Sequence, residues 1–307
     1  MNYSNYPQRP LVFFSSMATA SSYRTKRKDM VHIIGGYALC VLLVPLYVNM
    51  FPVWKYISTI WGSDVFKVLP VFALAGLLGG IFLVMWLPRI RPGPPAAAVT
   101  RYRLPVAGGL LLCLLGLAIT DPAFPVKRIH VAEYLLLSLI ARAVMSLRLQ
   151  GLPLLFYSAL FAAVLGIHDE FIQGLHPART YGLNDMAVNG LGALGGALIW
   201  HGTGLFDSPR KSRTNANQKA SSMVERLYLG WLFFSVFALI VPLFFFRGFA
   251  LPLWPSLPLL GAMVFFTIYL QRFSSNSLHG LGALSAAAGA LVIYPLLGQF
   301  SGILLFY

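Results

Sequence analysis

Apolar residues fall in nine blocks along the chain, and each block is close to the length of a membrane-spanning helix. A helix needs about 20 apolar residues to cross a hydrocarbon layer of about 30 Å. Prolines inside the blocks, such as Pro45 and Pro295, are tolerated in a bilayer because neighbouring helices satisfy the freed carbonyls. The pattern therefore predicts an all-α, polytopic transmembrane helix bundle, with a count of eight to ten left open by the long last block. The nine predicted spans are 31–53, 68–87, 104–120, 129–147, 151–170, 184–205, 227–246, 251–270 and 279–300.

Composition agrees with a bilayer as the solvent of this chain. Hydrophobic residues make up 58% of the sequence, charged residues only 10%, and the mean hydropathy is +0.73. A chain that folds in water around one core does not have this composition. Cys40 and Cys113 each lie inside an apolar block, so neither a disulfide framework nor a zinc site is indicated. We expect a multi-pass protein of the cytoplasmic (inner) membrane with lipid neighbours and no cofactor.

The basic residues indicate how the chain is oriented in the membrane. The formal net charge of +14 could suggest a nucleic-acid partner, but Lys and Arg lie in short loops between apolar blocks and not on one folded face. Cytoplasmic loops are rich in Lys and Arg. With a cytoplasmic N-terminus, most of the 23 basic residues fall in internal segments, and the external segments hold Lys55, Lys67, Lys127, Arg128, Arg179 and Arg247. The sequence therefore predicts an N-in topology and no nucleic-acid partner.

This topology divides the chain into five regions. A cytoplasmic N-terminal segment is followed by two spans with a basic cytoplasmic loop, by a four-helix core, by a polar cytoplasmic linker rich in Arg, Lys, Ser and Asn, and by a three-span region. In that order the predicted regions are 1–30, 31–103, 104–205, 206–226 and 227–307.

Acidic residues and histidines concentrate in the core. Five of the nine acids and three histidines lie within 65 residues: Asp121, Glu133, Asp169, Glu170, Asp185, His130, His168 and His176. On the predicted topology they all lie at the external membrane boundary. An ionisable group that faces lipid costs at least ~2.5 kcal/mol, so these groups should face protein, water or a cation. We expect a polar cup, open to solvent, at the mouth of the bundle.

Helical spacing places the polar residues on shared faces. His130, Glu133 and Tyr134 follow i, i+3, i+4, and Asp169 and Gln173 follow i, i+4. The helix over 184–205 carries its polar and glycine residues along one stripe, and its glycines form a small-xxx-small surface that lets another helix approach closely. That stripe consists of Asp185, Asn189, Gly192 and Gly196.

Two stretches of the core resemble the VanZ-like family of bacterial envelope proteins. They are KRIHVAEY at 127–134 and GIHDEFIQGLHPARTYGLNDMAVNGLGALGG at 166–196, and the resemblance covers about 104–205. The sequence departs from the family pattern at Val126, where an acid is common, and at Val131, where an aromatic residue is common; Asp121 could replace the acid. The family's motif residues correspond to Lys127, His130, Tyr134, Asp169, Glu170, Gln173, Arg179, Asp185, Asn189 and Gly192.

The resemblance implies a role in the cell envelope, and some VanZ-like proteins are associated with reduced susceptibility to teicoplanin. We expect an external polar site that recognises a cell-wall precursor, a lipid head group or a glycopeptide. The candidate site residues are Lys127, His130, Glu133, Tyr134, Asp169, Glu170, Gln173, Arg179, Asp185 and Asn189, with Gly192 and Gly196 as helix-packing residues.

Three other interpretations remain open at this point. A membrane-embedded enzyme could use Asp169, Glu170 and His130 as acid and base on a lipid-linked substrate, although no nucleophile elbow, HExxH or P-loop pattern accompanies them. A secondary transporter is a further alternative, and the cluster could also be a structural lock between helices. Carboxylates with an imidazole could hold a divalent cation, but their spacing matches no standard site, so no metal is predicted.

Overall fold

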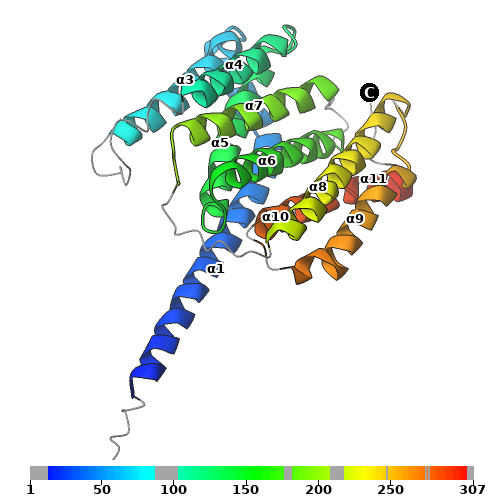
Figure 1. Cartoon of the computed structure of the whole chain (residues 1–307). Coiled ribbons are helices and arrows are strands. Elements are labelled where there is room, and N and C mark those ends of the chain that lie inside the picture. The colour runs from blue at the N-terminus through cyan, green and yellow to red at the C-terminus, as the bar shows by residue number, and fades with distance from the viewer. Residues whose placement is uncertain are drawn as a thin grey trace, which may run out of the picture.

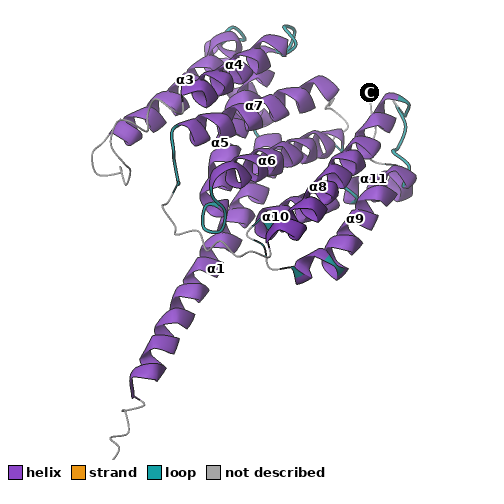
Figure 2. Ribbon diagram, viewed as in Figure 1, coloured by secondary structure: helices purple, strands orange, loops and turns teal. Residues whose placement is uncertain are grey.

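The computed structural model describes residues 13–86, 103–175, 182–207, 218–246, 248–273, 275 and 277–302. The predicted all-α class is confirmed, since the described residues form helices and no strand (Figure 2). The helices are α1 (Phe13–Val48), α2 (Phe51–Trp61), α3 (Val65–Trp86), α4 (Arg103–Ile119), α5 (Ile129–Met145), α6 (Gly151–Gly174), α7 (Leu183–Gly202), α8 (Gln218–Ile240), α9 (Leu257–Ile268), α10 (Leu278–Ala290) and α11 (Ile293–Ser301).

Several helices are long and apolar enough to cross a membrane. Among the described residues five segments meet this condition: Asp29–Val48, Gly151–Gly174, Met223–Phe244, Trp254–Arg272 and Leu278–Ser301. A sixth is present if the bent pair Pro52–Trp61 and Val65–Gly80, which turns by 116°, counts as one span. Helix α4 is apolar but shorter.

Two predicted spans differ from the observed helices at proline residues. The first predicted span ran to residue 53, whereas α1 ends at Val48 and α2 begins at Phe51 with Pro52 in its first turn, the helical position that proline tolerates. The last predicted span corresponds to the apolar segment Leu278–Ser301, in which the helix tightens between α10 and α11. Pro295 cannot donate to the carbonyl four residues earlier, and the chain there forms the tighter bonds Leu291 N to Ala288 O (3.0 Å) and Val292 N to Gly289 O (3.1 Å).

Helix α7 lies at the centre of the core and packs against α4, α5 and α6 (Figure 1). Glycines make these contacts close. A Cβ on Gly195 would lie 2.8 Å from the backbone oxygen of Gly109 on α4, and a Cβ on Gly192 would lie 2.9 Å from the backbone oxygen of Val131 on α5. Small residues allow such backbone approach, and the close van der Waals packing that results holds helices together in a bilayer.

The flanking helices cover the opposite side of α6. Helix α1 packs on α5 and α6, and its N-terminal half extends away from the bundle (Figure 1). Helix α10 packs on α6, α8 and α9. The Tyr228 hydroxyl of α8 donates to the Ala262 carbonyl (2.9 Å) of α9 and bonds to the Ser285 hydroxyl (3.1 Å) of α10. The C-terminal helices are therefore attached to the core through α10.

A buried arginine holds the turn after α7. The Arg142 side chain, fully buried in the last turn of α5, donates from Nε to the Leu205 carbonyl (2.8 Å) and pairs through Nη2 with Asp207 Oδ1 (2.8 Å). The sequence placed Arg142 among the basic residues that mark the cytoplasmic side. In the structure it also connects α5 to the segment that follows α7.

Candidate functional site

The polar cluster forms where four segments meet: the short helix Pro125–Arg128, the first turns of α5, the C-terminal part of α6 and the first turns of α7. Helix α6 continues to Gly174, so Asp169, Glu170 and Gln173 all lie on a regular helix. Gly182, in an extended conformation, is the N-cap residue of α7. The cluster is therefore positioned by helices.

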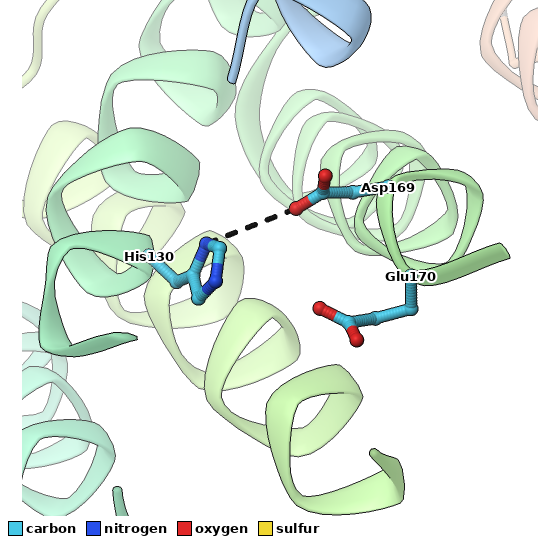
Figure 3. A group of neighbouring side chains, drawn as sticks. All are labelled: His130, Asp169 and Glu170. Carbon is cyan, nitrogen blue, oxygen red and sulfur yellow. Dashed lines mark ion pairs between the residues drawn. The ribbon is translucent and has the colours of Figure 1, made fainter. Parts of the chain in front are cut away.

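His130 is the centre of the cluster. Its Nδ1 donates to Glu133 Oε2 at 2.9 Å and lies 3.7 Å from Asp169 Oδ2. Figure 3 shows Asp169 and Glu170 reaching from α6 toward the imidazole on α5. One ligand atom from each of His130, Asp169 and Glu170 lies within 4.8 Å of the others. An imidazole and three carboxylates thus share one small volume.

Amide groups hold the two α6 carboxylates in place. Gln173 Nε2 donates to Asp169 Oδ1 at 3.2 Å. Glu170 accepts from the Gly182 backbone N–H (3.4 Å) and from Asn189 Nδ2 (3.4 Å), which also donates to the Gly166 carbonyl (3.0 Å). Gly166 is required for this contact, because a Cβ there would lie 2.7 Å from the Asn189 Cβ.

Lys127 and Asp185 form an ion pair at the edge of the cluster. Asp185 is only 4% exposed, while the Lys127 side chain keeps 23% of its surface exposed. The pair joins the short helix before α5 to the first turn of α7. It brings together two residues that are 58 positions apart in the sequence.

The cluster is closed, which differs from the solvent-open cup expected from the sequence. Asp169, Glu170 and Asn189 have no exposed surface, and His130 is 8% exposed. Helix α1 supplies part of the cover: the Tyr47 hydroxyl donates to the Glu133 carbonyl at 3.4 Å, and its ring packs edge-on against Tyr134 with centroids 6.2 Å apart. Sequence reasoning missed Tyr47, which carries no motif signal and lies 86 residues from Glu133.

Three buried polar atoms of the cluster make no hydrogen bond of normal geometry with any described residue. They are the Tyr134 hydroxyl, Asp169 Oδ2 and Asn189 Oδ1. A buried polar group without a partner costs about 1–3 kcal/mol, and native proteins leave few of them. Tyr134 and Asp169 interact with one another, and Asp169 Oδ2 also lies 3.7 Å from His130 Nδ1. Asn189 Oδ1 is therefore the atom of the three that fits a ligand with a hydrogen-bond donor.

Other predicted residues lie elsewhere. His176 and Arg179 fall outside the described residues. Asp121 is exposed and accepts from the Ala123 backbone N–H (2.8 Å), so it does not take the place of an acid beside Lys127. His168, next to Asp169 in sequence, faces away from the cluster: its Nε2 donates to the Ala287 carbonyl (2.9 Å), and its Nδ1 accepts from the Tyr294 hydroxyl (2.7 Å).

A cavity of about 720 Å³ lies on that other face of α6, between α1 and α10. Its walls are largely apolar, with His168 and the hydrogen-bonded pair Tyr37 and His279 as polar groups. Leu42 of α1 and Ala286 of α10 line the cavity and are also exposed on the outside of the bundle. Helix α6 thus separates the polar cluster from an apolar cavity that reaches the outer surface of the bundle.

No protein-family model, curated protein or solved structure matches the chain.

Proposed function

We propose that the chain is a VanZ-like, multi-pass protein of the cytoplasmic membrane, with about nine spans and the N-terminus in the cytoplasm. The support is the motif residues of the core, the apolar helices and the distribution of Lys and Arg along the sequence. On this topology the His130 cluster lies at the outer boundary of the membrane. A site at this position meets envelope components and not cytoplasmic ones.

The proposed activity is recognition of an envelope amphiphile. This molecule is either a lipid-linked cell-wall precursor or a membrane lipid that is recognised by its head group. The observation that carries this proposal is the division of α6 into two faces. Phe161, Leu165 and His168 line the apolar cavity, and Asp169 and Glu170 reach into the polar cluster. The cavity suits the hydrocarbon chain of such a molecule, since its volume falls in the range of about 300–1,000 Å³ that is usual for ligand sites.

The hydrocarbon part of this proposal is tested by filling the cavity. Ala286→Phe places a ring in the cavity, and Ala107→Phe places the same ring on the exposed surface of α4 as a matched control. The probe is a phospholipid in nanodiscs that carries a photoreactive group near the end of one acyl chain. We expect cross-links on α1, α6 and α10 to fall about tenfold in Ala286→Phe, equivalent to ~1.4 kcal/mol of lost binding, and to persist in Ala107→Phe.

Equal cross-linking of the two phenylalanine variants would contradict a hydrocarbon chain in the cavity. Glu170→Gln serves as a second comparison, since it alters the polar cluster and leaves the cavity lining intact. We expect this variant to keep the acyl-chain cross-links and to lose any preference among phospholipids with different head groups.

The resemblance to VanZ-like proteins gives a further test in a teicoplanin-sensitive Gram-positive host. Expression of the wild-type chain is expected to reduce teicoplanin susceptibility severalfold. At matched membrane abundance, Glu170→Gln and Asp185→Asn should abolish the protection, because each changes a buried carboxylate of the cluster. Asp121→Asn, an exposed acid outside the cluster, should retain it. Unchanged susceptibility with abundant, folded wild type would contradict glycopeptide protection.

A further inference from the structure

The polar cluster holds more negative than positive charge among the described residues. Lys127 is paired with Asp185, so Glu133, Asp169 and Glu170 face a single imidazole, that of His130. With all three carboxylates ionised, even a protonated imidazole would leave two negative charges, an excess that a proton held on a carboxylate or a bound cation would relieve. Arg128 lies beside Lys127, and no ion pair of the described residues joins it to these acids. The charge balance is therefore compatible with a bound cation.

The positions of the side chains fit coordination of one ion. Ligand atoms of His130, Asp169 and Glu170 lie within 4.8 Å of one another, and all three residues are buried. Ligand atoms that each lie about 2.1 Å from one tetrahedral metal ion are about 3.4 Å apart. The separations would therefore shorten by up to roughly 1.4 Å when the three atoms surround a common ion.

The surrounding hydrogen bonds leave ligand atoms available. Glu133 holds the Nδ1 side of the imidazole at 2.9 Å, and in Figure 3 the other ring nitrogen of His130 points toward Glu170. A carboxylate that fixes the far nitrogen of a ligating histidine is a usual feature of metal sites. Gln173 binds only Oδ1 of Asp169, so Oδ2 has no hydrogen bond of normal geometry. Asn189 Oδ1 is a further buried oxygen without a partner.

We propose that His130, Asp169 and Glu170 bind a divalent transition-metal ion, with Glu133 as a positioning residue. One imidazole and two carboxylates are ligands suited to zinc or manganese. This inference goes beyond the proposed recognition of an amphiphile and does not rest on it. The bound cation would offset two of the three negative charges of the cluster.

The test uses full-length protein in nanodiscs, stripped with a chelator and then equilibrated with Zn²⁺ or Mn²⁺ alone. We expect one ion per chain by elemental analysis, together with a rise in the thermal unfolding temperature. His130→Gln and Asp169→Asn should each lose both the ion and the thermal shift. Glu133→Gln should weaken affinity about 10–100-fold, as expected for a residue that orients a ligating histidine.

Two variants serve as controls because they keep the proposed ligands. Asp121→Asn removes an exposed acid, and His168→Gln removes the neighbouring imidazole that faces the cavity. Both should bind the ion as wild type does. Folded wild type that binds neither metal would overturn the proposal. A loss of metal in Asp121→Asn as large as the loss in His130→Gln would also overturn it. Acyl-chain cross-linking needs no metal, so failure of the metal site is distinguishable from failure of the amphiphile proposal.

Discussion

Gly192→Leu is expected to prevent stable association of α5 with α7 and to reduce the amount of folded protein in the membrane. A Cβ at this position would lie 2.9 Å from the Val131 backbone oxygen and 3.1 Å from the Val131 Cα. These are backbone atoms of α5, so relief requires the two helices to separate. Overpacking of a core costs about 1–3 kcal/mol or more, and separation here would also displace the adjacent His130.

A matched control lies two residues earlier on the same helix. A Cβ on Gly190 would have no heavy atom of a neighbouring segment within 4 Å, so Gly190→Leu adds the same side chain without a clash. The measurement is the thermal unfolding temperature of both purified variants, with membrane abundance as a second readout. Similar stability of Gly192→Leu and Gly190→Leu would contradict the close approach of α5 and α7.

The apolar blocks predict the core helices well. The predicted spans 104–120 and 129–147 correspond to Arg103–Ile119 and Ile129–Met145. The span predicted to end at residue 170 continues as helix to Gly174. Hydropathy ends the span where charged residues begin, whereas α6 continues because Asp169, Glu170 and Gln173 are buried against neighbouring segments and hydrogen-bonded there.

The sequence predicts only some of the residues that lie together at the site. Spacing groups His130 with Glu133, and the structure joins them at 2.9 Å. Spacing cannot tell that His168 faces Tyr294, 126 residues away, because α6 is buried against neighbours on several sides. Burial of the cluster was also missed, since the cover supplied by Tyr47 of α1 is a long-range contact that no periodicity encodes.

Loss of the Lys127 side chain should be strongly destabilising. Lys127→Met would leave the carboxylate of Asp185, which is 4% exposed, without its ion-pair partner. Removing one partner of a buried pair costs about 3–5 kcal/mol, and the lower end applies here because Lys127 is partly exposed. The free energy of unfolding should recover in Lys127→Met/Asp185→Asn, where no unpaired charge remains. Lys67→Met breaks an exposed pair with Asp64 as a matched control and should have a much smaller effect.

The double variant also separates a structural lock from a ligand site. If the pair only fixes the register of the helices, Lys127→Met/Asp185→Asn should recover stability and keep both metal binding and teicoplanin protection. We expect recovered stability without protection, because Lys127 is paired with Asp185 of the cluster and its partial exposure leaves it accessible to an anionic group. If the double variant reduces teicoplanin susceptibility as much as wild type does, the ion pair has only a structural role. Failure to recover stability would show that Asp185 is held by contacts other than Lys127.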